Sequence, residues 1–233
     1  MPRNTPRNSE VAVMGLERVQ AAIRHPAQAG AFILDWDGVL ADTRLDFKPL
    51  RQKYFGDSAV AGLGMLEAAS TFPDPLREEA MAEIRGIEME GAERATAVDG
   101  AKDLIAWLAG GGTVADKPRK PRPWAVVSRN CRDSIVLAAE RCGIALPSVL
   151  LSREDPYVKP DPKALALAAE RLGVNLSDCV MVGDFVYDLQ AARSAAIPSV
   201  LVRSGGAEWE RLADFTYATV KDFVEALDAF DPT

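Results

Sequence analysis

The chain has 233 residues, of which 48% are apolar and 26% charged, a composition typical of a folded globular protein with one or two domains. Lysine and arginine together number 27 against 34 aspartates and glutamates, so the net charge is −7 and a general affinity for nucleic acid or anionic membranes is not favoured. The sequence has no apolar run of about 18 residues and no signal-peptide pattern, and we therefore expect a cytoplasmic protein without a membrane segment.

The first elements predicted along the chain are a helix and a buried strand. Apolar residues recur at helical spacing between Ser9 and His25, which predicts an amphipathic helix within an N-terminal extension over 1–30. The run AFIL at 31–34 is continuously apolar, which is typical of a strand that is covered on both faces of a sheet.

A helical segment follows this strand. From 43 to 97 we find no strand pattern, and the text is rich in Ala, Glu, Arg and Met. Asp74 and Pro75 stand where the N-cap and first residue of a helix are expected. We interpret 44–97 as a small helical cap domain, inserted into a core domain that is formed by 31–43 and 98–233.

From residue 98 onward, helices and strands alternate. The expected helices are 101–109, 132–142, 162–172, 187–195 and 221–230, and the expected strands are 124–128, 148–152, 179–183 and 199–203. Asp161 and Pro162 should begin the helix that Gly173 ends. This alternation predicts an α/β fold with a doubly wound, Rossmann-like parallel sheet. We expect 110–123, which contains three prolines and four basic residues, to be an exposed loop.

Polar residues follow the predicted strands at the points where the strands end. The candidate site residues are Asp35, Asp37, Gly38, Ser128, Arg129, Asn130, Lys159, Asp184 and Asp188. An open parallel sheet binds its ligands outside the carboxyl ends of the strands. These side chains are therefore expected to meet in one crevice.

The acidic residues of this set call for a cation. Carboxylates that lie close together disfavour one another's ionised form. Oxygen ligands without histidine or thiolate suit a hard ion, and Mg²⁺ is the expected one. Asp35, Asp184 and a backbone carbonyl can hold it, while Lys159 neutralises an aspartate and a phosphoryl oxygen and the Ser128 hydroxyl donates to phosphate. The set predicts a phosphoryl-transfer site.

Asp35 and Asp37 are expected to have different roles. Side chains alternate in direction along an extended backbone, so one carboxylate can attack phosphorus while the other reaches the leaving oxygen. An aspartate nucleophile forms an aspartyl phosphate, and a second carboxyl group can give a proton to the leaving group and take one from water.

These motifs resemble a known family. DWDGVLADT, Ser128, Lys159 with Pro160 after it, and GDFVYD resemble, in this order, the four motifs of the haloacid dehalogenase (HAD) superfamily phosphatases. DGVLADT is especially similar to the phosphoglycolate phosphatase and beta-phosphoglucomutase branch, in which a helical cap follows the first motif. The resemblance covers about residues 31–230.

The resemblance implies a role for each motif residue. Asp35 would be the nucleophile, and Asp37 the general acid and base, whose main-chain carbonyl also binds Mg²⁺. Asp184 would be the other carboxylate ligand, with Asp188 behind it. Lys159 would stabilise the nucleophile and the phosphoryl group. Asp37 also argues against a true dehalogenase, because members that act on carbon-halogen bonds lack an acid there.

Phosphate contacts are expected on a second group of residues. Ser128 is expected to bind phosphate, and Gly38 to lie beside it while giving the chain room to leave for the cap. Arg129 and Asn130 either contact the phosphate or only begin the following helix. Asp42 and Thr43 either contact substrate or serve as a hinge.

Other residues have simpler interpretations. The basic group Arg44, Lys48, Arg51 and Lys53 either faces solvent or reaches an anionic substrate. We expect Trp36, Trp107, Trp124 and Trp209 in or near the core, and Cys131, Cys142 and Cys179 as buried thiols. His25 is the only histidine, and catalysis by a histidine-dependent triad is therefore set aside.

The sequence thus favours a Mg²⁺-dependent phosphatase that acts on a small phosphorylated metabolite and resembles phosphoglycolate phosphatase. A phosphomutase with the same site is the alternative. A receiver-type phospho-acceptor module is disfavoured because the helical insertion and Asp37 argue for turnover. We expect a small-molecule phosphate ester as partner, without nucleic acid or membrane. The physiological ester and the oligomeric state are left open.

Overall fold

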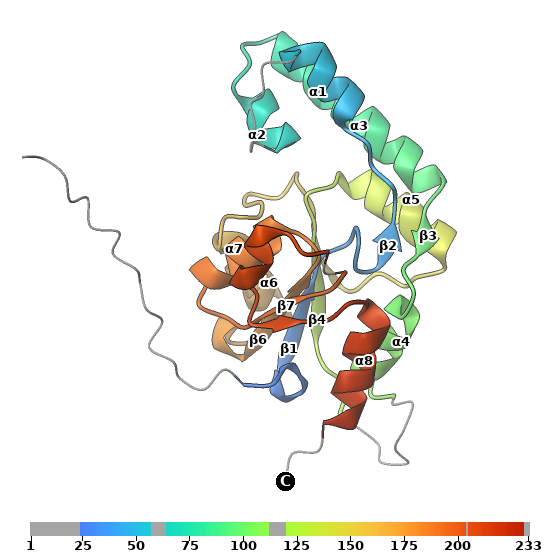
Figure 1. Ribbon diagram of the computed structural model, residues 1–233, viewed down its shortest axis with the longest axis vertical. Coiled ribbons are helices and arrows are strands. Elements are labelled where there is room, and N and C mark those ends of the chain that lie inside the picture. The colour runs from blue at the N-terminus through green and yellow to red at the C-terminus, as the bar shows by residue number, and fades with distance from the viewer. Residues whose placement is uncertain (1–23, 57–63, 112–119, 204, 231–233) are drawn as a thin grey trace, which may run out of the picture.

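The computed structural model describes residues 24–56, 64–111, 120–203 and 205–230 (Figure 1). The helix predicted from Ser9 lies almost wholly outside these ranges, as does most of the predicted loop at 110–123. None of the described helices is long and apolar enough to cross a bilayer.

A six-stranded sheet forms the centre of the fold. Its strands are β1 (Ala31–Leu34), β4 (Trp124–Val127), β5 (Val149–Leu151), β6 (Cys179–Gly183), β7 (Ser199–Leu201) and β8 (Phe215–Thr216). They lie in the order β5-β4-β1-β6-β7-β8, and all neighbouring pairs are parallel. Leu34 is paired with both Val126 and Val182, so that the carboxyl ends of β1, β4 and β6 are level. The predicted doubly wound parallel sheet is confirmed.

Helices cover both faces of the sheet. The helices of this part of the chain are α4 (Ala101–Leu108), α5 (Arg132–Cys142), α6 (Lys163–Leu172), α7 (Val186–Ser194) and α8 (Val220–Ala229). Phe32 and Leu34 of β1 pack in the core on the side of α4, α5 and α8, whereas Ala31 and Ile33 pack against α6 and α7. The continuously apolar strand is therefore explained by burial on both faces.

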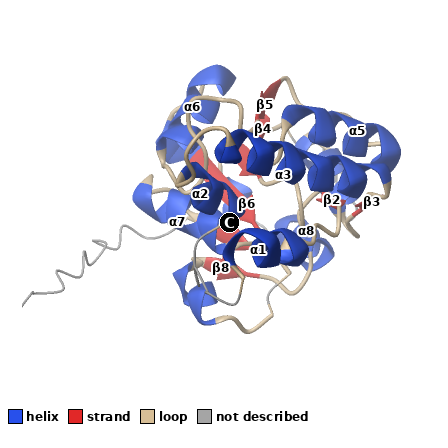
Figure 2. Ribbon diagram, turned by 90° about the horizontal axis from the view of Figure 1, so that it is seen from above, coloured by secondary structure: helices blue, strands red, loops and turns tan. Residues whose placement is uncertain are grey.

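Three helices lie above the carboxyl end of the sheet (Figures 1 and 2). They are α1 (Lys48–Phe55), α2 (Met65–Ser70) and α3 (Leu76–Glu93). They share a small core of Leu50, Met65, Ala69, Ala80 and Ile84. The far end of α3 packs along α5. The proposed domain boundaries at 44 and 97 stay a prediction.

Two predictions for this segment are wrong. Residues Thr96–Ala97 form a strand, β3, which pairs antiparallel with β2 (Ala41–Asp42) where the segment leaves and rejoins the core. Strands of two residues are too short to leave a periodic pattern. Asp74 does not cap α3, which begins at Leu76 without a side-chain cap, and its carboxylate pairs with Arg77 at 2.7 Å.

Other elements differ from prediction mainly at their ends. The helix expected from Pro162 begins at Lys163, although the Asp161 carboxylate does accept a hydrogen bond from the Lys163 N–H at 2.9 Å, and Gly173 ends the helix as expected. Strand β8 and three short 3₁₀ helices, Pro26–Gln28, Leu176–Asp178 and Glu208–Leu212, were not predicted.

Several side chains can be compared with their predicted surroundings. The three cysteines are buried, as are Trp36 and Trp107. Trp209 is only half-buried and lines a pocket instead of the core. Arg122 was expected to face solvent, but it is half-buried and donates hydrogen bonds to the carbonyls of Ala27 and Ala29.

Candidate active site

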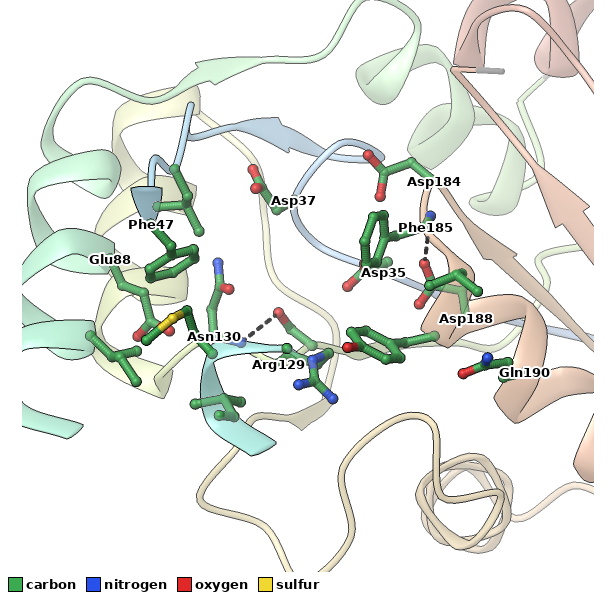
Figure 3. A pocket seen from close by; sticks show the side chains of 18 of the residues that line it. Asp35, Asp37, Phe47, Glu88, Arg129, Asn130, Asp184, Phe185, Asp188 and Gln190 are labelled. Carbon is green, nitrogen blue, oxygen red and sulfur yellow. Dashed lines mark hydrogen bonds between the residues drawn. The ribbon is translucent and has the colours of Figure 1, made fainter. Parts of the chain in front are cut away.

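A pocket of about 830 Å³ lies between the carboxyl ends of the central strands and the three upper helices (Figure 3). The predicted site residues that line it are Asp35, Asp37, Ser128, Arg129, Asn130, Asp184 and Asp188. These residues follow β1, β4 and β6, whose ends the register holds level. The predicted convergence is therefore observed for these seven residues, whereas Gly38 and Lys159 do not line the pocket among the described residues.

Lys159 is fully buried and contacts two of the candidate carboxylates. Its ammonium group is 2.7 Å from an Asp35 carboxylate oxygen and 2.6 Å from one of Asp188. Burial by itself lowers the pKa of Lys159, but the negative charges of Asp188 and Asp35 outweigh this effect and the pKa is raised. Lys159 is therefore charged and is bound between two carboxylates.

The two carboxylates of the first motif have different surroundings. Asp35 Oδ1, which contacts Lys159, also accepts the Trp36 N–H at 2.7 Å, so that Oδ2 remains for other chemistry. Asp37 Oδ1 accepts hydrogen bonds from the Thr43 N–H at 2.9 Å and from the Thr43 hydroxyl at 2.6 Å. Burial raises the pKa of Asp37 although the Thr43 hydrogen bonds lower it.

Thr43 thus orients Asp37 by a contact that the sequence analysis missed. The turn after Asp37 returns through β2, which brings Thr43 back beside it. Asp42, considered together with Thr43, lies in β2 and pairs with Arg44 at 3.5 Å. Of the basic group, Arg51 lines the pocket, whereas Lys53 is paired with Glu79 at 3.0 Å.

Asp184 and Asp188 lie in an acidic environment. Burial raises the pKa of Asp184 to about 8, and the charges of Asp35, Asp188 and Asp37 contribute to the shift. Burial, followed by the charge of Asp35, raises the pKa of Asp188 to about 6 in spite of Lys159. The site therefore carries more negative charge than Lys159 alone can balance.

The donor set fits a hard cation. Carboxylate oxygens of Asp35, Asp184 and Asp188 lie within 4.8 Å of one another, without a histidine or thiolate. Asp188, however, already uses Oδ1 for Lys159 and accepts the Phe185 N–H on Oδ2 at 3.1 Å. Asp35 and Asp184 are therefore better placed than Asp188 to offer a free oxygen to an ion.

Gly38 allows Asp184 to approach the first motif. Its φ is +79°, and a Cβ on it would lie 1.8 Å from Asp184 Oδ2. Gly38 itself does not line the pocket among the described residues, and its contribution is steric. Both the backbone conformation and the missing side chain are required here.

The loop after β4 is held by Glu88 and Arg153, which were not among the candidate site residues. The Asn130 N–H donates to the Ser128 hydroxyl oxygen at 3.1 Å. Glu88 of α3 accepts the Cys131 N–H at 3.0 Å and pairs with Arg153, whose own N–H donates to the Asn130 carbonyl at 3.1 Å. Arg153 follows the end of β5, so the strand-end rule would have found it. Glu88, one of several glutamates in α3, leaves no such signal.

Arg129 connects the core to α2. Its guanidinium lies 2.7 and 2.8 Å from the two carboxylate oxygens of Glu67 and 4.2 Å from the centre of the Tyr187 ring. It also donates to the Lys159 carbonyl. The two roles considered for Arg129 from the sequence, phosphate contact and helix start, did not include this pairing, because Glu67 is distant in sequence.

The fold and the site together define a Rossmann-like α/β protein with an acidic site at the strand ends. Residues 29–196 match the family described as haloacid dehalogenase-like hydrolase. The chain therefore belongs to the haloacid dehalogenase-like hydrolases, as its four motifs indicated.

Two relatives illustrate the similarity in sequence. Over 65 residues the chain is 45% identical to a phosphoglycolate phosphatase of Xylella fastidiosa, a match that covers 28% of this chain and 27% of that protein's length. Over 197 residues it is 26% identical to the N-acetylmuramic acid 6-phosphate phosphatase of Pseudomonas aeruginosa, with 75% and 82% covered.

Solved structures show the same fold. A hydrolase from Pseudomonas syringae superposes with a TM-score of 0.66 at 22% identity, covering 85% of this chain and 98% of that one. A beta-phosphoglucomutase from Clostridium difficile gives 0.63 at 17% identity, covering 86% and 97%. Identities this low bear on the fold and not on the substrate.

Proposed function

We propose that the protein is a Mg²⁺-dependent phosphatase that hydrolyses a small-molecule phosphate ester through an aspartyl phosphate on Asp35. The observation that carries this proposal is the pairing of one Asp35 oxygen with buried Lys159, while Asp37 stands beside it with a raised pKa. The family membership and the phosphatases among the similar proteins support it.

In the first half of the reaction, a carboxylate oxygen of Asp35 attacks phosphorus and the bond from phosphorus to the ester oxygen breaks. Asp37, which is held by Thr43 through Oδ1, gives its proton to the departing oxygen. Its raised pKa favours the protonated form that this step needs. Ser128 and Asn130 supply hydrogen-bond donors for the phosphoryl oxygens, and Lys159 balances the charge on Asp35.

In the second half, Asp37 accepts a proton from water as the water oxygen attacks phosphorus, and Asp35 leaves as the carboxylate. Asp35, Asp184 and the Asp37 carbonyl would hold Mg²⁺, which supplies positive charge against the phosphoryl oxygens when it is bound. Asp188 keeps Lys159 and the Phe185 backbone in place.

The first test is phosphate release from 4-nitrophenyl phosphate. We expect turnover with Mg²⁺, none with excess chelator, a loss of at least about a thousandfold in Asp35→Asn, and a strong reduction in Asp37→Asn. Asp46→Asn is the matched control, because Asp46 is an exposed carboxylate that accepts only the Lys48 N–H among the described contacts. Full activity of Asp35→Asn, or turnover that is indifferent to chelator, contradicts the proposal.

A phosphomutase is the alternative that the sequence left open. It would pass the phosphoryl group to a second substrate instead of water, and the shared fold does not separate the two reactions. Hydrolysis is favoured because the family is described as one of hydrolases. Release of phosphate that requires no acceptor other than water distinguishes hydrolysis from transfer. A receiver-type module would show no multiple turnover on any ester.

A further inference from the structure

We propose that the ester carries a bulky apolar or aromatic leaving group, instead of a small one with a second negative charge. This inference rests on the proposed phosphatase function and deepens it. It concerns the part of the pocket beyond the carboxylates, where the group attached to the phosphate must lie.

The side of the pocket formed by the upper helices is largely apolar. Its apolar lining residues are Leu45, Phe47, Met65, Leu66 and Ile84. The volume of about 830 Å³ falls in the range of about 300–1,000 Å³ that is typical of sites for ligands of drug size. A two-carbon acid would leave most of this apolar surface in contact with water.

The core side adds an aromatic cluster. The Phe185 ring packs edge-on against Tyr187 and Trp209, with centroids 5.4 and 5.6 Å away, and all three residues line the pocket. Phe185 directly follows Asp184, yet 48% of it is exposed. Figure 3 shows Phe185 beside Asp35 and Asp184, with Phe47 across the pocket near Glu88 and Asn130. An apolar group on the phosphate can therefore contact rings on two sides.

The arginines of the pocket are already engaged. Arg129 has both Glu67 oxygens on its guanidinium and the Tyr187 ring against its face. Arg51 is not free either. A carboxylate or second phosphate on the leaving group would have to displace Glu67 from Arg129, which costs the interaction of a half-buried, charge-assisted pair. The lining thus favours apolar leaving groups and disfavours anionic ones.

Three alkyl esters test this preference. The leaving groups of propyl phosphate and 3-phenylpropyl phosphate are alcohols of nearly equal acidity, so a difference in kcat/KM reports the binding of the phenyl ring. We expect kcat/KM for 3-phenylpropyl phosphate to exceed the values for propyl phosphate and phosphoglycolate by at least about tenfold. Equal or faster hydrolysis of propyl phosphate or phosphoglycolate would overturn the inference and leave the proposed phosphatase function intact. No hydrolysis of any ester, including 4-nitrophenyl phosphate, would contradict both.

Variants locate the preference in the pocket. Phe47→Ala is expected to lower the ratio of kcat/KM between the phenylpropyl and propyl esters by at least about threefold. Phe72 packs against the same small core but does not line the pocket among the described residues, so Phe72→Ala should keep the ratio. Trp209→Ala tests the other side should Phe47→Ala fail to fold. A ratio unchanged in Trp209→Ala and in any folded Phe47→Ala overturns the inference.

Discussion

Gly38 is the residue at which the backbone of the first motif and the carboxylate of Asp184 come closest. From the sequence, Gly38 is expected to give the chain room to turn, and its φ of +79° agrees with this. The closeness of Asp184 to the position that a Cβ on Gly38 would occupy was not predictable, because Asp184 comes from the end of β6, far along the chain.

Replacing Gly38 should therefore change the affinity of the site for Mg²⁺. We expect Gly38→Ala to weaken Mg²⁺ binding by at least about tenfold, since the new methyl group displaces Asp184. Gly173→Ala is the control, because Gly173 also has a positive φ, +69°, but nothing within 4 Å of its Cβ position. Calorimetric titration of the two folded variants with Mg²⁺ measures both affinities. Equal Mg²⁺ affinities in the two variants would show that the crowding at Gly38 has no role.

At the level of elements, α3 both lines the pocket and connects two loops of the core. It packs along α5, and its buried Glu88 joins the loop after β4 to the loop after β5 through Cys131 and Arg153. A single glutamate in a helix that contains several others gives no sign of this in the sequence. The helix itself was predictable from composition, whereas its partner was not.

Breaking this connection should affect stability and catalysis together. Glu88→Gln leaves Arg153 without its anionic partner in a buried position, which costs about 3 kcal/mol and lowers Tm by about 6–12 °C. It should also lower kcat/KM, because the Cys131 N–H contact positions the loop after β4, which we propose binds phosphate. Glu83→Gln on the same helix is the control: its carboxylate pairs with Lys53 at the surface, and little change in Tm is expected. Similar Tm values for the two variants would contradict this account.

At the scale of the whole molecule, the alternation of strands and helices was enough to predict the sheet, its parallel strands and the edge that carries the site. The exceptions are elements held by tertiary contacts. Strands β2 and β3 are two residues long, and β8 extends only from Phe215 to Thr216 at the edge of the sheet. The contacts from α2 and α3 into the site, through Glu67 and Glu88, arise only when the segment folds over the core.

The acidic site also has a consequence for the stability of the whole protein. Asp184 is buried among three other carboxylates, so Asp184→Asn should raise the Tm of the metal-free protein at mildly alkaline pH by about 3 °C, because it removes a buried charge and its repulsion by these carboxylates. Mg²⁺ should raise the Tm of the unaltered protein and leave that of the variant nearly unchanged. Thermal unfolding with and without chelator measures this. A variant that is less stable than the metal-free parent would be evidence that the repulsion is not significant.

The covalent intermediate proposed on Asp35 can be trapped by rapid acid quenching. Asp37→Asn should retain the first step with 4-nitrophenyl phosphate, whose leaving group needs little protonation, but should discharge the aspartyl phosphate slowly. We predict that the quenched variant carries one acid-stable, base-labile phosphoryl group, on the peptide that contains Asp35, and that the double variant with Asp35→Asn carries none. Release of 4-nitrophenol during multiple turnover without a phosphoryl group on that peptide would contradict a covalent intermediate on Asp35.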